Sequence, residues 1–445
     1  MSIQTSALTT PAVSDPAQSA APSEVIMISQ ISRAWVGGAV AMLVIGALFF
    51  SQPLFGLGVL LSVVLLGSWA WARWCLVNLQ IERRFSHTRA FWGEEVAMDH
   101  IFVNNKPLPL PWLIVEDEYP AVFPMLSHTL TYSARPGRLG FDSSISLGWY
   151  ERVTRHHTFL CAMRGEHEFG PIEIRSGDIF GLFRRYATYA TPATLLVYPR
   201  YVPVERLGIP ARQPFGDYKA VQQLATDPLR LRAVREYSYG DNQRYIHWKA
   251  TARRGELQTK LFEPSATPQL SIFLNQDTFV HMYEGLDPPT LELAITVAAS
   301  VANHALEQGW MVGLQINAFA SNSDRQVKIP ASRDPGQLTR VLESLARIKG
   351  WSGLPVEDLL RAQRYTLSKG ATLVVVTGVV TSDLLDVLLT LRRAGHPVTL
   401  IETVGSSRAA SYAHGKSPSS IEAQGITYYL VDAIGEAESI EGLSF

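Results

Sequence analysis

The sequence predicts a multidomain protein with an N-terminal two-helix transmembrane hairpin, an all-β sandwich-like domain and an α/β doubly wound domain. Three observations predict this class. Two uncharged apolar stretches lie near the N-terminus, a series of short alternating segments follows, and the last part alternates apolar runs with helical patterns. A chain of 445 residues is also too long for one ordinary core, so several folded units are expected.

Residues 31–75 contain the two apolar stretches, at 34–50 and 54–72. Neither stretch carries a charge, and "SQP" separates them. At about 1.5 Å per residue each helix would span roughly 25–29 Å, close to the hydrocarbon thickness of a bilayer. The pattern therefore predicts two membrane spans, whereas a buried helical hairpin in a large core is the alternative.

The charges that flank these stretches predict their orientation. The connection between the spans has no basic residue. Basic residues stand before the first span, at Arg33, and after the second, at Arg73, Arg83, Arg84 and Arg89. Because cytoplasmic flanks carry the excess of Lys and Arg, both ends are expected inside the cell. The flanking charges thus predict a two-pass membrane protein with the bulk of the chain in the cytoplasm.

The predicted order of the parts follows composition. Residues 1–30 are rich in Ser, Thr, Ala and Pro and are expected to form a disordered tail. Residues 78–200 contain short β-branched and aromatic segments separated by Gly, Pro and Asn, which is typical of a sandwich. Residues 201–264 form a connector with a charged helical motif. Residues 265–445 alternate strands and helices, which predicts a mostly parallel sheet.

Composition also excludes several kinds of function. The net charge of −1 gives no basic field for nucleic acid, and two cysteines are too few for a cysteine zinc site or a disulfide framework. The sequence lacks G-x-x-x-x-G-K-[ST], G-x-S-x-G and H-E-x-x-H, so the usual signals of nucleotide hydrolysis, serine hydrolysis and zinc hydrolysis are missing. No cofactor is predicted.

The stretch "REYSYGDNQRYIHWKATARRGELQTKLFE", residues 235–263, gathers the charged residues of the connector. Between 230 and 263 there are eight basic and four acidic residues. We expect a helix that Asp241 caps and Gly255 ends, with Tyr245, Trp248 and Ala252 facing inward. The candidate site residues share a place in this motif: Arg235, Glu236, Asp241, Arg244, His247, Trp248, Lys249, Arg253, Lys260 and Glu263.

Three functions are open for this motif. In the first, the protein is an enzyme of unknown reaction in which Asp241 and His247 form an acid–base pair. The site of that enzyme also includes Arg244 and Lys249. In the second, the basic residues meet a phosphate or an acidic partner surface. In the third, the charges pair with one another in a polar network between domains, because buried charges persist only when they are paired.

With these residues in view, the chain resembles the bacterial family catalogued as domain of unknown function 58. The motif at 235–263 carries the resemblance, together with "LPWLIVEDEYP", "RGEHEFGPIEIRSGDIFGLF" and "AASVANHALEQGWMVGL". The resemblance implies a protein of the bacterial inner (cytoplasmic) membrane with a von Willebrand factor A-like domain. It also implies partnership with a MoxR-type AAA+ ATPase and a transglutaminase-like membrane protein, and hence a scaffold or adaptor role. It implies no biochemical activity.

The resemblance to von Willebrand factor A-like domains raises the question of a metal site. An adhesion-type Mg²⁺ site needs D-x-S-x-S after the first strand, since hard oxygen ligands hold the ion. Here Asn275 stands in the aspartate position, Asp277 and Phe279 stand in the serine positions, and Gly378 replaces a second acidic ligand. The motif is therefore degenerate: Asp277 is a weak candidate for a cation, and no metal site is predicted.

Overall fold

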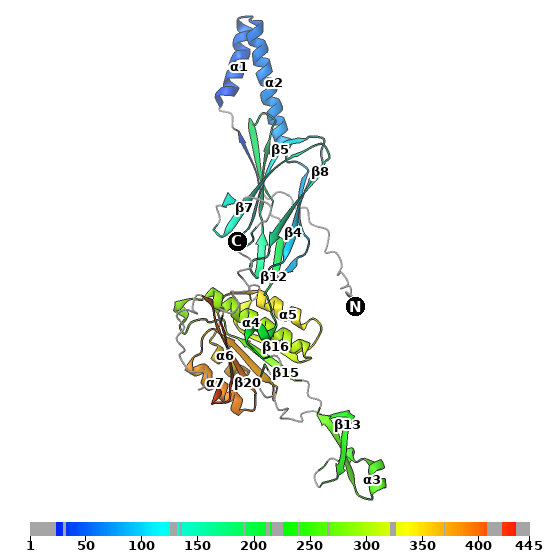
Figure 1. Cartoon of the computed structure of the whole chain (residues 1–445). Helices are drawn as coiled ribbons and strands as arrows, with labels where there is room; N and C mark the ends of the chain where they lie inside the picture. The colour runs from blue at the N-terminus through cyan, green and yellow to red at the C-terminus, as the bar shows by residue number, and fades with distance from the viewer. Residues whose placement is uncertain are drawn as a thin grey trace. The chain divides into compact units, whose positions relative to one another are not determined.

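The computed structural model describes residues 24–29, 33–124, 131–132, 136–189, 193–210, 214–215, 226–238, 241, 243–264, 268–320, 326–368, 370–406 and 421–432 (Figure 1). The chain divides into two compact units, residues 1–197 and 198–445. Separate hydrophobic clusters fill the β-rich first unit and the sheet of the second unit. The multidomain, β-rich organisation that the sequence predicts is confirmed.

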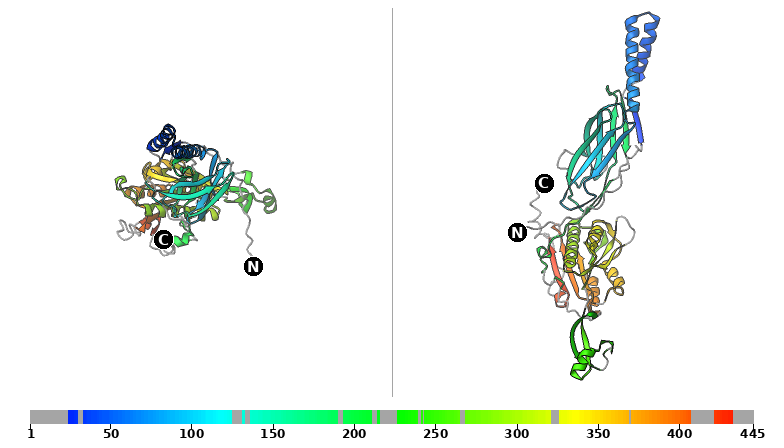
Figure 2. Two further views of the ribbon diagram at one scale, coloured as in Figure 1. Left: turned by 90° about the horizontal axis from the view of Figure 1, so that it is seen from above. Right: turned by 90° about the vertical axis from the view of Figure 1, so that its right-hand side faces the viewer.

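Two apolar helices, α1 (Arg33–Leu48) and α2 (Gln52–Trp74), pack against each other in the first unit (Figure 1 and Figure 2). Glycines permit the close approach: a Cβ at Gly46 would lie 2.6 Å from the Phe55 nitrogen, and one at Gly58 would lie 2.9 Å from the Leu43 nitrogen. α2 is long and apolar enough to cross a membrane, whereas α1, with 16 residues, is a shorter apolar helix.

The strands of the first unit form three antiparallel sheets, in the orders β1-β11-β10-β5-β7-β6, β2-β4-β8 and β3-β12-β9. They are β1 (Glu24–Ser29), β2 (Leu79–Phe85), β3 (Arg89–Phe91), β4 (Glu95–Asn104), β5 (Leu110–Pro120), β6 (Thr131–Tyr132), β7 (Arg138–Leu147), β8 (Arg152–Leu160), β9 (Gly165–Phe169), β10 (Ile172–Gly177), β11 (Phe183–Tyr189) and β12 (Ala193–Tyr198).

Strand β1 departs from the predicted tail. Residues 24–29, "EVIMIS", add an edge strand that is antiparallel to β11, from Glu24 opposite Thr188 to Ser29 opposite Phe183. Val and Ile favour extended backbone, and the open edge of β11 supplies the hydrogen-bonding partners. The remainder of the tail, residues 1–23 and 30, lies outside the described residues.

Alternation along the strands places one side chain in two toward the core. Leu113, Val115, Asp117 and Tyr119 of β5 are all buried, and the residues between them are half-buried. On β8 the same rule separates two neighbouring histidines. His157 is buried, whereas His156 is exposed and its Nδ1 lies 2.6 Å from the Asp99 carboxylate.

The second unit contains a seven-stranded sheet in which β17-β16-β15-β19-β20-β21 are neighbours and β18 also pairs with β16. The five strands from β16 to β21 in this order are parallel. The strands are β15 (Gln269–Leu274), β16 (Met311–Ala320), β17 (Gln326–Ser332), β18 (Ile348–Ser352), β19 (Thr372–Thr377), β20 (Val398–Val404) and β21 (Thr427–Asp432).

Helices connect these parallel strands. These helices are α4 (Pro288–Glu307), α5 (Gln337–Ala346), α6 (Val356–Gln363) and α7 (Ser382–Arg393). The short 3-10 helices η1 (Val204–Leu207) and η3 (Met282–Glu284) precede β13 and α4, respectively. α6 and α7 pack on the sheet face that carries Phe273, Leu373 and Val375. α4 contacts α5 and the strands β15, β16, β19 and β20. Because these five strands run in the same direction, their carboxyl ends meet at one edge of the sheet.

Residues 226–264 form a small separate element, here called the arm. Strands β13 (Thr226–Glu236) and β14 (Gln258–Pro264) make their own two-stranded antiparallel sheet, and η2 (Gln243–Tyr245) and α3 (Trp248–Arg254) lie between them. The charged motif of the predicted connector is therefore folded within a hairpin.

Candidate functional site

The turn that follows β13 is fixed by one ion pair. The Arg235 guanidinium lies 2.6 Å from the Asp241 carboxylate, and the Ser238 N–H donates to the other oxygen of that carboxylate at 2.9 Å. The Tyr237 hydroxyl donates to the Asp241 carbonyl at 3.2 Å. Hydrogen bonds from Arg235 and from Ser238 hold the pKa of the Asp241 carboxyl below its usual range. Asp241 thus shapes the turn.

The helix of the motif begins later than the sequence predicts. α3 starts at Trp248, and its cap is His247, whose Nδ1 accepts a hydrogen bond from the Ala250 N–H at 3.1 Å. Gly255 ends it in the left-handed conformation, as expected. The prediction that Asp241 caps this helix is wrong, because Ile246 pairs with Thr259 of β14 and so interrupts any helix that begins at 241.

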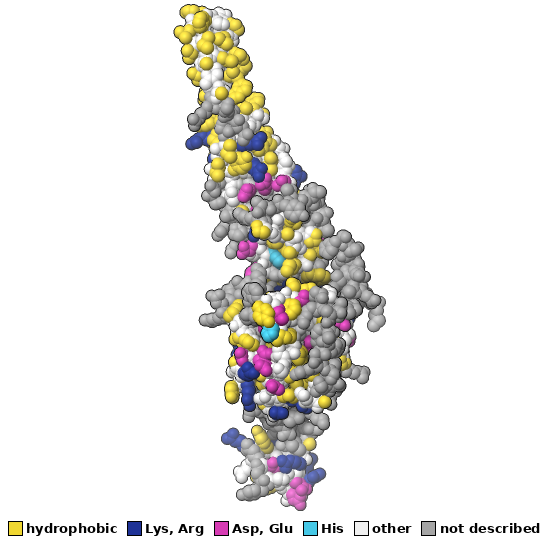
Figure 3. Space-filling view, turned by 90° about the vertical axis from the view of Figure 1, so that its left-hand side faces the viewer, with side chains coloured by type: hydrophobic (Ala, Val, Ile, Leu, Met, Phe, Trp, Pro, Cys, Tyr) yellow, Lys and Arg dark blue, Asp and Glu magenta, His cyan; other side chains and the backbone are white. Residues whose placement is uncertain are grey.

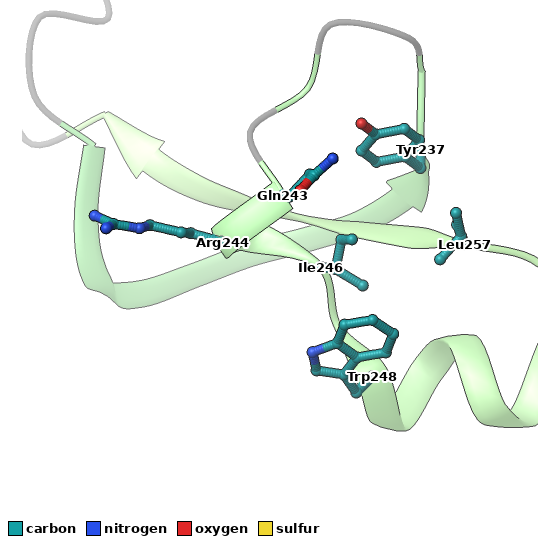
Figure 4. Close-up of a pocket in the computed structure, with 6 residues that line it drawn as sticks. All are labelled: Tyr237, Gln243, Arg244, Ile246, Trp248 and Leu257. Carbon is teal, nitrogen blue, oxygen red and sulfur yellow. The ribbon is translucent and has the colours of Figure 1, made fainter.

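A shallow cleft of about 580 Å³ opens on the arm (Figure 4). Ile246 and Trp248 lie side by side at the start of α3, and Arg244 extends away from them (Figure 4). Trp248 is 68% exposed and Leu257 is 46% exposed, although Ile246 beside them is buried. The expectation that Trp248 and Ala252 face inward is wrong, since both are exposed. The full lining is Tyr237, Gln243, Arg244, Ile246, Trp248 and Leu257.

The short helix α3 carries three exposed basic side chains in addition to the exposed tryptophan. Lys249, Arg253 and Arg254 are exposed, and within the described part of the chain none of the three forms an ion pair. Lys249 and Arg253 are four residues apart, so they share one face of α3. Arg254 and Leu257 were missed by the sequence analysis, because the prediction of one long helix gave neither residue a role.

The other predicted residues lie in the strands. Glu236 ends β13 and is exposed, and Lys260 in β14 is half-buried. Glu263 belongs to β14, but its side chain lies outside the described residues. Asp241 and His247 make separate contacts, with Arg235 and with the Ala250 N–H, so the geometry does not bring them together as an acid–base pair. What the arm presents is an exposed indole on a short helix that also carries exposed cationic groups.

A second polar cluster lies at the carboxyl ends of the parallel strands. The Asn317 side-chain amide, from β16, donates to Asn275 Oδ1 at 2.8 Å and to the Asp277 carboxylate at 3.0 Å. Asn317 Oδ1 accepts from the Gln276 N–H at 2.7 Å, and Asn275 Nδ2 donates to Thr377 Oγ1 at 3.0 Å. Amide and hydroxyl groups therefore tie β15, β16 and β19 together at this edge.

This cluster contains one acidic side chain, Asp277, which stands in a serine position of the degenerate adhesion-type motif. Asp277 is engaged with Asn317, and a Cβ at Gly378 would come within 2.6 Å of the Thr290 side chain, which leaves little room for a second acidic ligand. Among the described residues no group of three or more His, Cys, Asp or Glu is placed to hold a metal ion. Asp277 stays a weak candidate for a cation, and the prediction remains that no metal site is formed here.

Comparison with known sequences agrees with the resemblance drawn from the charged motif. The family model described as "Protein of unknown function DUF58" matches residues 233–409, which include most of the arm and the sheet as far as β20. The chain is also 28% identical over 312 residues to the uncharacterized protein YeaD of Bacillus subtilis (strain 168), covering 70% of this chain and 73% of that protein. The A-like fold and the ATPase partner stay predictions.

Comparison with solved structures gives weaker similarities. Salmonella alpha-2-macroglobulin reacted with methylamine matches with a TM-score of 0.21 and 19% identity, covering 27% of this chain and 9% of that one. A type II cohesin domain from the cellulosome of Acetivibrio cellulolyticus matches with a TM-score of 0.17 and 14% identity, covering 26% of this chain and 93% of that one. At such scores neither similarity carries an argument.

Proposed function

We propose that this chain is a membrane-anchored scaffold or adaptor whose arm docks an acidic surface of a partner protein. The observation that carries the proposal is that Trp248 is exposed on the same short helix as the exposed cations Lys249, Arg253 and Arg254. An indole with 68% of its surface open to water is costly to leave uncovered, and Trp and Arg are the residues most often found at the centre of protein interfaces.

The arm is built as a preformed surface. The Arg235–Asp241 pair fixes its turn, and His247 and Gly255 fix the two ends of α3. A partner that binds here meets ordered side chains, so little conformational entropy is lost on association. Charge then selects the partner, because cations that have no ion pair within the described arm favour an acidic surface. Following the family resemblance, the partner is a MoxR-type AAA+ ATPase, with a transglutaminase-like membrane protein in the same assembly.

The anchor follows from the exposure of α2. A core helix of a soluble protein is mostly buried, whereas only 11% of the most apolar window of α2 is buried within the structure. Val63 and Leu66 are 62% and 66% exposed. Lipid is the environment that such a surface fits. Together with α1 it forms the two-pass anchor of our proposal, and the basic residues that flank the two helices support an arm on the cytoplasmic side of the inner membrane. The sheet of the second unit serves as the A-like module.

Binding of a purified MoxR-type ATPase to the full chain in lipid nanodiscs tests the proposal. We expect saturable binding that weakens as salt is added, since exposed charges are screened. Arg253→Glu should weaken the affinity by about 10- to 100-fold, because it places like charges against each other across the interface. Trp248→Ala should have a similar effect through loss of the apolar contact.

Arg393→Glu is the matched control for Arg253→Glu. Both arginines are exposed in the last turn of a helix, Arg393 in α7 and Arg253 in α3. The control should bind as the unmodified chain does. Equal losses from both reversals would point to non-specific charge attraction, and the absence of saturable binding by the unmodified chain would remove the ATPase as the partner.

A further inference from the structure

The strands β1 to β12 of the first unit are here called the β domain. Three loops of the β domain lie at the end where α2 enters it. The register places Leu79 opposite Asn104, Leu110 opposite Leu147, and Ser29 opposite Phe183. Because β2 begins only five residues after α2 ends, these strand ends all lie beside the helix. The loops 105–109, 148–151 and 178–182 therefore lie at the end of the domain that α2 enters.

The tips of two of these loops are apolar and exposed. Trp149 and Tyr150 are 71% and 68% exposed, and Ile179 and Phe180 are 59% and 66% exposed. At the opposite end of the domain the exposed large apolar side chains among the described residues are only Phe91 and Met163. The apolar surface is therefore concentrated at the end that carries the helices.

These loop tips are held in place by specific contacts. The Asp178 carboxylate accepts hydrogen bonds from the Phe180 N–H at 3.0 Å and the Phe183 N–H at 2.7 Å. Tyr150 has a positive φ of +52°, in the left-handed region, and its N–H donates to the Lys106 carbonyl at 3.3 Å. A non-glycine residue adopts that region only at an energetic cost, so presentation of the ring is built into the loop.

The join between α2 and the domain is rigid. Cys75 and Leu76, directly after the helix, belong to the buried core of the β domain, and Arg185 of β11 donates to the Arg73 carbonyl. The Tyr189 hydroxyl donates to the Leu79 carbonyl at 3.4 Å. With no flexible linker in this segment, the depth of α2 in a bilayer also sets the height of the loops.

Basic residues complete the composition of this end. Arg73, Arg152 and Arg184 are exposed, and the Arg73 guanidinium lies 5.8 Å from the centre of the Trp69 ring. Figure 3 shows hydrophobic side chains over both helices and Lys and Arg side chains just beyond their base. Aromatic rings next to basic groups are typical of the level of lipid headgroups.

We propose that this end of the β domain rests on the bilayer, with Trp149, Tyr150, Ile179 and Phe180 inserted at the headgroup level. The proposal rests on the proposed function, in which α2 crosses the membrane. It adds a second contact with lipid, which fixes the orientation of the β domain against the membrane surface. The occupant of the surface is the lipid interface itself, including anionic headgroups that the arginines attract.

Depth measurement by spin labelling tests this contact. The full chain is placed in nanodiscs of phosphatidylcholine and phosphatidylglycerol, with one nitroxide on Tyr150→Cys or Phe180→Cys. Val63→Cys, in the middle of α2, reports whether the helix is inserted, and Met163→Cys is the control at the opposite end of the domain. The native Cys75 and Cys161 are buried, and the unmodified chain measures their background.

The collision rates with oxygen and with a water-soluble nickel complex give the depth of each label. We expect positions 150 and 180 to favour oxygen, less strongly than position 63, and position 163 to favour nickel. If position 63 is deep while 150 and 180 match 163, the lipid contact is overturned and the anchor stands. If position 63 is itself aqueous, the anchor and the lipid contact both fall. Labels at 150 and 180 that neither reagent reaches would indicate a protein partner instead and overturn the proposal.

Discussion

Arg83, His100 and Asp117 form a buried polar cluster in the β domain. Asp117 Oδ2 lies 2.8 Å from His100 Nε2, and the Arg83 guanidinium forms an ion pair with the same carboxylate. Arg83 and His100 come from the sheet β2-β4-β8, whereas Asp117 comes from β5 of the larger sheet. Burial alone would raise the pKa of Asp117, but Arg83 and His100 outweigh it and hold the pKa low. The cluster joins two sheets.

Asp117→Asn should therefore destabilise the protein strongly. The change leaves the Arg83 charge buried without its counter-charge, and such losses cost about 3–5 kcal/mol. Asp142→Asn, on an exposed position of β7, is the control and should change the free energy of unfolding by less than about 0.5 kcal/mol. Urea unfolding of both variants in the same detergent measures the difference. Similar midpoints for the two would contradict this role of the cluster.

The Arg235–Asp241 pair gives the arm a pH dependence. Because the pKa of Asp241 is lower in the folded arm, the pair stabilises the arm above the unfolded pKa of about 3.9. That stabilisation is lost as the pH falls through the folded pKa. We expect the Ser238 amide to lose protection from hydrogen exchange at strongly acid pH, after correction for the intrinsic rate. Asp241→Asn should lack protection at neutral pH too, and protection that persists in this variant would contradict the assignment.

At the scale of the elements, part of the charged motif follows from local sequence and part does not. Gly255 ends α3 because glycine takes the left-handed conformation without a Cβ clash, and this was predictable. The start of α3 was not, since Ile246 pairs with Thr259 and the His247 N–H donates to the Gln258 carbonyl at 2.7 Å. These contacts join residues across the hairpin, and a helical periodicity within 241–255 carries no information about them.

His247 should act as a helix cap rather than as a catalytic base. His247→Ala removes the acceptor for the Ala250 N–H and should weaken α3 by about 1 kcal/mol, whereas His247→Asn keeps a cap acceptor and should cost less. Hydrogen exchange at the Ala250 amide in both variants measures this order. Equal loss of protection in the two variants, or none in either, would show that the cap does not stabilise the helix.

At the scale of the whole molecule, the sequence predicted the multidomain class and an apolar N-terminal segment because hydrophobic patterning is local. The observed bounds of the elements differ from the predicted ones for reasons that hydrophobic patterning does not contain. α1 ends at Leu48, before the predicted limit at 50, because the Ser51 N–H donates to the Gly46 carbonyl in the turn and Phe50 takes a positive φ. The β1 strand and the hairpin that encloses the charged motif depend on pairing with distant segments, which composition does not reveal.

The central claim is that the arm is the docking surface of a membrane-anchored adaptor. Photo-crosslinking in native membranes, with benzoylphenylalanine in place of Trp248, tests it most directly. Tyr365, which is 87% exposed in the second unit, is the control position. We predict one crosslinked protein from position 248, identified as a MoxR-type ATPase by mass spectrometry, which disappears when Arg253→Glu is added. The same crosslinked proteins from both positions, or none from position 248, would contradict the account.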